Sequence, residues 1–122
     1  MNSKEARKFL EDWFNKVWLQ SSVDNLKLYY DENVKITANG SLRNREGLIK
    51  HCEWCKENEK ITKIDFIDVV AEEDAIAFRF QYEYSNKNAS GLKGENIGIM
   101  HLNKNKKIIQ VDVKSSEIFG AD

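Results

Sequence analysis

The stretch Ile76-Ala-Phe-Arg-Phe-Gln-Tyr-Glu-Tyr84 alternates large apolar side chains with small or polar ones. In an extended chain, successive side chains point to opposite faces. One face of this stretch therefore carries only isoleucine and aromatic residues, whereas the other carries Arg79, Gln81 and Glu83. A period of two with every large apolar residue on one side predicts a β-strand with one buried face.

The same period of two extends on both sides of this stretch. It predicts four long strands, at about 62–71, 74–85, 93–103 and 107–116, and strands joined by such short turns run antiparallel. A shorter alternating run at 34–38 predicts one more strand, which ends at the turn pair Asn39-Gly40. In the last two long strands, the predicted inward-facing residues are Gly98, Met100, Leu102, Ile109, Val111 and Val113. The predicted outward-facing residues that are apolar or aromatic are Ile97, Ile99, His101 and Ile108.

Upstream of the strands, the apolar residues recur at intervals of three and four, which is the period of a helix. Three helices are predicted, at about 3–19, 24–30 and 45–57. Asn2 and Glu5 have the spacing of a capping box at the start of the first helix. Asn44 is a candidate N-cap for the third helix.

Helices followed by a run of antiparallel strands predict an α+β layer fold. Because strands twist, a long meander curls. We therefore expect a single domain over residues 1–122: a curved antiparallel sheet of four long strands plus one short strand, covered on its concave face by three N-terminal helices. This arrangement is the cystatin-like cone, and it leaves a cavity where the helices and the sheet do not quite meet.

The composition argues against several classes of partner. The 122-residue chain has a formal net charge of −1, so it lacks the basic surface that binds nucleic acid. No apolar run is long enough to cross a bilayer, so no membrane partner is expected. The charged N-terminus does not resemble a signal peptide, and a cytoplasmic location is the expectation.

Four segments resemble the SnoaL-like branch of the nuclear transport factor 2-like superfamily. They are residues 23–36, Asn44-Arg-Glu-Gly-Leu-Ile49, residues 68–78 with Asp68-Val-Val-Ala-Glu, and residues 103–113. The resemblance implies a pocket between the helices and the concave sheet face, and a homodimer through the convex face. It does not imply an activity, because one fold hosts many functions.

Ketosteroid isomerases are distant members of the same superfamily. They use an Asp base, together with a Tyr and a protonated Asp that stabilise the oxyanion. The resemblance places these three positions on Ala38, Phe14 and Gly98, and none of these residues can transfer or donate a proton. Steroid isomerase chemistry is therefore not expected.

The cone is expected to enclose a mainly apolar and aromatic pocket for a small apolar or aromatic molecule. The nine residues predicted to line it are Trp13, Phe14, Tyr30, His51, Trp54, Phe80, Tyr82, Met100 and Val111. His51 is the weak candidate for a catalytic acid or base, since its reference pKa lies near neutrality. The alternative is a half-exposed helix residue that stacks on Trp54. Tyr30 and Tyr82 either point hydroxyls into the cavity or are structural.

Cys52-Glu-Trp-Cys55 has the C-x-x-C spacing of redox and zinc sites. The pair falls inside a predicted helix, and no second such pair follows, so we interpret both thiols as small core residues. No nucleotide-binding or hydrolase motif occurs, and no cofactor or metal is expected.

Two hypotheses remain open. In the first, the chain binds a small molecule, and it is undecided whether it is also a cofactor-independent enzyme of proton transfer or hydrolysis. In the second, it is a non-catalytic interaction module that dimerises through the outer sheet face, where Ile97 and Ile99 would otherwise meet water.

Overall fold

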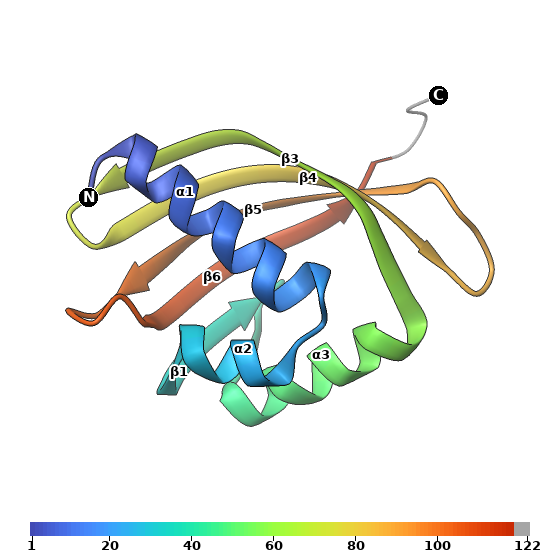
Figure 1. Ribbon diagram of the computed structural model, residues 1–122, viewed down its shortest axis with the longest axis horizontal. Helices are drawn as coiled ribbons and strands as arrows, with labels where there is room; N and C mark the ends of the chain where they lie inside the picture. Colours follow the sequence, from blue (N-terminus) through green and yellow to red (C-terminus); the bar gives the residue numbers. More distant parts are fainter. Residues whose placement is uncertain (119–122) are drawn as a thin grey trace.

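The computed structural model describes residues 1–118 of the chain (Figure 1). The elements follow in the order α1 (Ser3–Trp13), η1 (Phe14–Leu19), α2 (Val23–Tyr29), β1 (Tyr30–Ala38), β2 (Ser41–Arg43), α3 (Arg45–Asn58), β3 (Glu59–Glu72), β4 (Ala75–Asn86), β5 (Leu92–Leu102) and β6 (Ile108–Glu117). The three predicted helices and the four predicted long strands are all present.

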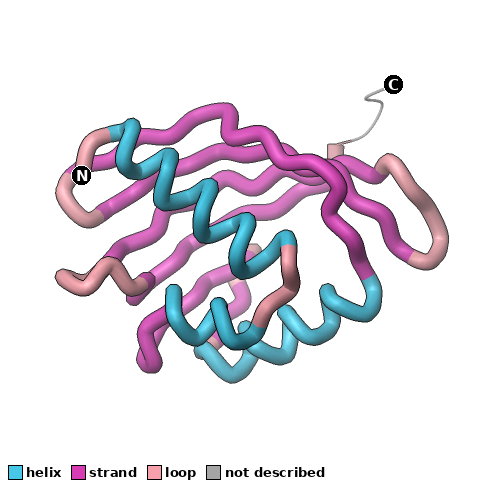
Figure 2. The backbone as a smooth tube through the Cα atoms, viewed as in Figure 1, coloured by secondary structure: helices cyan, strands magenta, loops and turns pink. Residues whose placement is uncertain are grey.

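The strands form one sheet of six in the order β2-β1-β6-β5-β4-β3. The four long strands pair antiparallel, as predicted. Two features were not predicted: β1 pairs with β6 in parallel, and β2 adds a three-residue strand at the edge. Figure 2 shows the sheet curving around the helices, so the architecture is the expected α+β cone.

The edge strand β2 follows directly from the turn pair Asn39-Gly40. Both residues have positive φ, 51° and 85°, so the chain reverses tightly and Ala38 pairs with Ser41. The Asn39 side-chain oxygen also accepts a hydrogen bond from the Ser115 N–H at 2.9 Å. That bond attaches the turn to β6 and fixes the rim of the sheet at this corner.

Each helix starts at a side-chain cap. Asn2 and Glu5 form the predicted capping box, with N···O distances of 2.8 and 3.0 Å. Ser22 caps α2, and Asn44 caps α3 by accepting a hydrogen bond from the Gly47 N–H at 2.9 Å. The first helix reaches Leu19 as predicted, but its last six residues form a π-helix, η1. A π-helical segment adds residues per turn, which redirects the side chains that follow it.

The core lies between the helices and the concave sheet face. Phe80 on β4 is at its centre, with ring centroids 5.4 Å from Phe14 and 5.3 Å from Phe66. The fully buried large side chains are Phe80, Leu10, Leu26, Ile76, Met100, Ile108, Val17 and Cys52. The helices therefore cover the sheet on one side only.

One register prediction is wrong. Leu102 pairs with Ile108 and His101 pairs with Gln110, so Ile109 is the extra residue of a β-bulge. The bulge turns Ile108 inward, with no exposed surface, and leaves Ile109 38% exposed. Strict alternation predicted the reverse, because an alternating pattern does not reveal where a strand contains an extra residue.

Among residues 1–118, no helix combines the length and the apolar character that crossing a bilayer requires.

Candidate functional site

A hollow of about 400 Å³ lies between the first helix with η1, α3, β1 and the concave face of the sheet. Aromatic side chains come from the helices and from β4, and the β1–β2 corner closes one end. The residues that line it are Trp13, Phe14, Trp18, Tyr30, Ile36, Ala38, Asn39, Arg43, Leu48, His51, Trp54, Cys55, Glu59, Ile61, Phe78, Phe80, Tyr82, Asn96, Val111, Val113 and Ser115.

Eight of the nine residues predicted to line a pocket lie on this hollow. The ninth, Met100, does not: it is fully buried and pairs with Ile76 and Val111 in the core. Met100 does face inward, but that part of β5 lies beneath packed side chains and away from the hollow.

Two glycines of β5 make room for the aromatic wall. A Cβ on Gly94 would lie 2.4 Å from the Tyr82 ring, and one on Gly98 would lie 3.0 Å from Phe78. Neither glycine has a positive φ. Their function is therefore to leave space, which allows two rings of β4 to lie flat across the neighbouring strand.

The hydroxyl of Tyr30 is a polar group on the wall of the hollow, and the residue is buried. It accepts a hydrogen bond from the indole Nε1 of Trp13 at 3.0 Å and another from the indole Nε1 of Trp18 at 3.3 Å. Burial raises the pKa of Tyr30 above its ordinary value, against the opposing effect of the two indole donors. Tyr30 therefore keeps its proton at every physiological pH.

His51 lies on the hollow, as a catalytic acid or base would have to. Its ring also stacks on Trp54, as the purely structural interpretation expects. The His51 and Trp54 rings are 6.1 Å apart and nearly parallel, and Trp18 packs at 6.0 Å. Burial lowers the pKa of His51, and the positive charge of Arg43 lowers it further. At neutral pH the imidazole is uncharged, which is the form that accepts a proton.

The two cysteines have different environments. Cys52 is fully buried in the core, as predicted, whereas Cys55 is half-buried and lines the hollow. The Cys55 Sγ lies 3.6 Å from His51 Nε2 and 4.0 Å from Glu59 Oε1. Burial, followed by the charge of Glu59, raises the pKa of Cys55 to about 12. Its thiol is therefore protonated near neutrality and is a poor nucleophile.

Several lining residues were not predicted. Trp18 reaches the hollow from η1, Arg43 from the unpredicted strand β2, and Glu59 from the first residue of β3. Asn96 had a signal in the sequence, because it alternates with Gly98 and Met100 on the inward face of β5. Its side-chain Oδ1 is buried and has no hydrogen-bond partner within the described chain.

No protein-family model matches the sequence, and no curated protein sequence matches it. Solved structures do match its fold. An LEH-like epoxide hydrolase of M. tuberculosis superposes with a TM-score of 0.73 at 10% identity, covering 93% of this chain and 84% of that one. A SnoaL-like protein from Mesorhizobium loti gives 0.64 at 18% identity, covering 93% and 98%. A nuclear transport factor 2-like protein from Cytophaga hutchinsonii gives 0.66 at 11%, covering 95% and 100%.

This chain has the SnoaL-like fold. Of the three positions that the sequence resemblance assigns to the isomerase groups, Ala38 and Phe14 lie on the hollow. The third, Gly98, lies against the ring of Phe78. None of these side chains can carry a proton, so isomerase-type residues are absent from these positions of the SnoaL-like cone.

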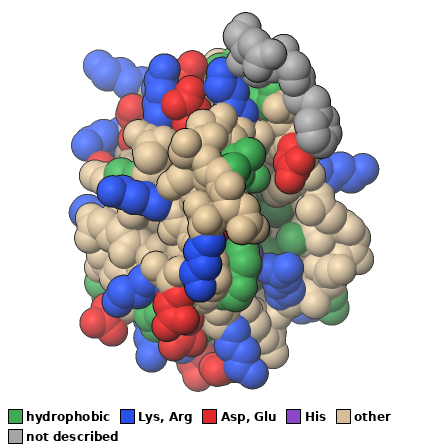
Figure 3. Space-filling view, turned by 90° about the vertical axis from the view of Figure 1, so that its right-hand side faces the viewer, with side chains coloured by type: hydrophobic (Ala, Val, Ile, Leu, Met, Phe, Trp, Pro, Cys, Tyr) green, Lys and Arg blue, Asp and Glu red, His purple; other side chains and the backbone are tan. Residues whose placement is uncertain are grey.

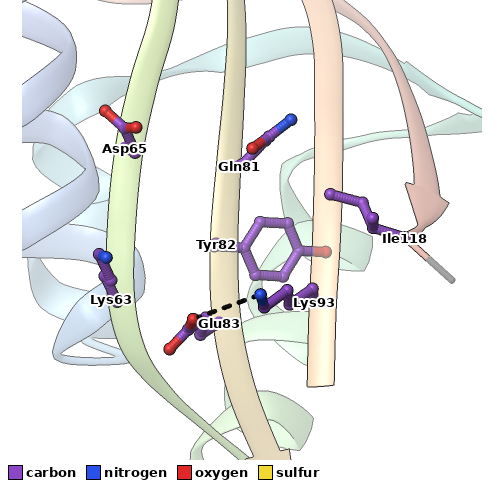
Figure 4. Close-up of a pocket in the computed structure, with 7 residues that line it drawn as sticks. All are labelled: Lys63, Asp65, Gln81, Tyr82, Glu83, Lys93 and Ile118. Atoms are coloured by element: carbon purple, nitrogen blue, oxygen red, sulfur yellow. Dashed lines mark ion pairs between the residues drawn. The ribbon is translucent and has the colours of Figure 1, made fainter. Parts of the chain in front are cut away.

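A second hollow, of about 160 Å³, lies against the strands of the same SnoaL-like sheet (Figure 4). Its lining is mostly charged or polar, and the Lys93 Nζ lies 3.9 Å from the Glu83 carboxylate. The seven residues are Lys63, Asp65, Gln81, Tyr82, Glu83, Lys93 and Ile118. It is smaller and more polar than the aromatic hollow, so the latter is the better candidate for a ligand site.

Charge on the surface is mixed in sign. Figure 3, which looks at the right-hand side of Figure 1, shows basic and acidic side chains interspersed around the edge of that face. Ion pairs such as Arg79 with Glu95, at 2.9 Å, connect neighbouring strands. Among the described residues that this view shows, basic side chains lie next to acidic ones.

Proposed function

We propose that the aromatic hollow is the binding site of a small, mainly apolar or aromatic molecule. The observation that carries this proposal is a space of about 400 Å³ with aromatic walls and a few enclosed polar groups. Natural ligand pockets are of this size and composition. Most of the wall is apolar, so removal of apolar ligand surface from water would supply most of the affinity.

The structural neighbours support a small-molecule function. The M. tuberculosis protein is named as an LEH-like epoxide hydrolase. The fold is shared, and the hollow of this chain lies between its helices and its concave sheet face. We infer that this chain uses its own hollow to bind a small molecule.

A fluorescent probe tests the proposal. The alkylnaphthalene N,N-dimethyl-6-propyl-2-naphthylamine is flat, apolar and fluorescent, and the anisotropy of its emission rises when a protein immobilises it. We expect it to bind the unaltered protein, and we expect Val111→Trp to weaken binding at least tenfold, because the larger side chain fills the hollow. Ile109→Trp is the matched control, since it adds the same side chain two residues away at an exposed position.

Circular dichroism is used to check that both variants fold. If Val111→Trp does not fold, Ala38→Phe is the second filling variant, because Ala38 lies on the same hollow near the end of β1. Equal binding by the filling variant and by the control would contradict the proposal. Failure of the unaltered protein to bind the probe would contradict it as well.

For any reaction in this hollow, we propose His51 as the acid–base group. It lies on the wall with a neutral imidazole, and the adjacent Cys55 is less suitable. The Cys55 thiol is protonated near neutrality, since its pKa is raised to about 12. His51→Gln keeps the size of the side chain but cannot exchange a proton near neutrality. Turnover that this variant leaves unchanged would remove His51 from the mechanism.

A second candidate function is dimerisation through the outer sheet face. Val70 and Ile97 are 62% and 52% exposed, and the register places Ile99 and Ala77 beside them. Ile108, which was also predicted there, faces the core instead. We propose that a second copy of the chain covers this patch of neighbouring apolar side chains.

Light scattering coupled to size exclusion tests this second proposal. A dimer is expected for the unaltered protein and a monomer for Ile97→Lys, because a charge would be buried without a partner. Leu42→Lys is the control, since Leu42 is exposed but lies on β2, away from the patch. A strict monomer for the unaltered protein would rule out this interface.

A further inference from the structure

Tyr30 has an unusual set of hydrogen bonds. Its hydroxyl oxygen accepts from two indole N–H groups, Trp13 Nε1 at 3.0 Å and Trp18 Nε1 at 3.3 Å. A tyrosine hydroxyl has two lone pairs and one proton. Two donors occupy both lone pairs, so the remaining capacity of this group is to donate its own proton.

Within residues 1–118, no hydrogen bond donated by the Tyr30 hydroxyl is present. A buried donor without an acceptor costs free energy, so such groups normally have a partner. Tyr30 lies on the wall of the aromatic hollow. The acceptor that is missing from the chain can therefore come from a molecule in the hollow.

The two indoles also make this hydroxyl a better donor. Hydrogen bonds in a chain polarise one another, so N–H groups that donate to the Tyr30 oxygen strengthen the bond that its proton makes. Trp13 comes from α1 and Trp18 from η1. The turn of π-helix between them is what brings both indoles to a single oxygen.

The surroundings limit the chemistry of the acceptor. Tyr30 is buried among apolar and aromatic side chains, where an ionised group would lose its hydration. A neutral carbonyl oxygen accepts a hydrogen bond without that cost. Asn96 offers a second polar contact in the same hollow, since its buried Oδ1 has no partner in the described part of the chain.

We infer that Tyr30 is a specificity-determining residue that donates a hydrogen bond to a neutral carbonyl oxygen of the bound molecule. The inference rests on the proposed function of the hollow and adds to it a chemical class, an apolar or aromatic carbonyl compound. Tyr30 holds the carbonyl, and Trp13 and Trp18 position and polarise Tyr30.

Two matched probes test this inference. N,N-dimethyl-6-propionyl-2-naphthylamine carries a ketone, and the 6-propyl compound used above has the same shape without the oxygen. For Tyr30→Phe we expect a loss of about threefold to tenfold in affinity for the ketone, which is the usual net contribution of one hydrogen bond. The affinity for the alkyl probe should change less than twofold.

Tyr29→Phe is the matched control. Tyr29 is the adjacent residue and is not among those that line the hollow, so the substitution removes the same hydroxyl from outside the site. It should leave the ratio of the two affinities unchanged. An equal loss for both probes in Tyr30→Phe, or an equal effect of the two variants on the ratio, would overturn the inference.

A second measurement uses only the unaltered protein, so it does not depend on the folding of a variant. The infrared C=O stretch of the bound ketone should move to lower frequency than in an aprotic solvent, because a phenol donor lengthens the bond. A stretch at the aprotic value would overturn the inference. In that case binding of the alkyl probe would still support the proposed function, whereas failure of both probes to bind would overturn both.

Discussion

The Asn96 side chain places a buried oxygen without a partner on the inward face of β5, across from Phe80 and Ser115 in the register. Leaving a buried acceptor unsatisfied costs about 1–3 kcal/mol. We expect Asn96→Leu to raise the free energy of unfolding by about 1 kcal/mol, as measured by urea denaturation. A hydrogen-bond donor on a bound ligand would remove this cost.

Asn44→Leu is the control for this prediction. The Asn44 side chain caps α3 through the Gly47 N–H at 2.9 Å, so its loss should lower the free energy of unfolding by about 1 kcal/mol. Equal destabilisation by the two variants would mean that the Asn96 oxygen has a partner in the folded chain.

His51 makes stability depend on pH. Because burial and Arg43 lower its pKa in the folded state, the unfolded chain binds a proton first as the pH falls. This group therefore does not reduce the free energy of unfolding above about pH 6.5, which is the pKa of histidine in the unfolded chain. The free energy of unfolding should fall as the pH drops below that value. We expect His51→Gln to lose less stability than the unaltered protein between about pH 7 and pH 5, in thermal melts at each pH.

The sign distinguishes this effect from that of Glu59. Burial raises the pKa of the Glu59 carboxyl, so its contribution is present at low pH and is lost as the pH rises. Removing His51 should flatten the acid side of the profile only. An identical profile for His51→Gln would show that the imidazole is not buried as the structure places it.

At the scale of single residues, sequence patterns located most of the aromatic side chains of the hollow, except Trp18 and Phe78, and missed most of its polar ones. Trp13 and Phe14 were found because a helix repeats its inward face every three or four residues. Arg43 was missed because its strand has only three residues, too few to show a period. Asn96 lies on the inward face of β5, as the alternation predicts. A polar residue on an inward face indicates a ligand contact only once that face is known to border a cavity.

Among the elements, β5 is shaped by its glycines. A Cβ on Gly98 would lie 2.5 Å from the backbone oxygen of Asp112, which cannot move without disturbing β6. A Cβ on Gly94 would meet only the end of the Tyr82 side chain, which can rotate away. We expect Gly98→Ala to destabilise by about 1–3 kcal/mol, and by more than Gly94→Ala, in parallel denaturation curves.

Gly94→Ala has a second expected effect. Because Tyr82 must leave its place above Gly94, the shape of the hollow should change and the binding of the naphthalene probes should weaken. Gly98→Ala leaves Tyr82 in place and should affect stability first. Larger destabilisation by Gly94→Ala would contradict the packing described for β5.

Two features of the helices and strands could not be predicted from the periodicity of the sequence. The π-helix η1 and the bulge at Ile109 each depart from the regular repeat, and a periodic template counts such a departure as noise. Both have consequences: η1 brings Trp18 to Tyr30, and the bulge exchanges Ile108 with Ile109. The helix caps were predictable, because Asn2 and Asn44 act through contacts within four residues.

For the whole molecule, the alternation in the last 60 residues or so was enough to predict a curved sheet with one covered face. Antiparallel strands joined by short turns are close together in the sequence, and contacts between such segments can be inferred from the sequence. The parallel pairing of β1 with β6 is not local, because α3 and four strands separate the two in the chain. No pattern within β1 distinguishes a parallel partner from an antiparallel one.

The most direct test of a ligand site in the cone uses its three tryptophans. All three in the chain, Trp13, Trp18 and Trp54, line the aromatic hollow, and none lies on the outer sheet face. In ¹H–¹⁵N NMR, titration with the ketone probe should shift all three indole N–H resonances and leave the backbone amides of Ile97 and Ile99 in place. Unmoved indole resonances together with shifted amides on the outer face would show that the hollow is not the binding site.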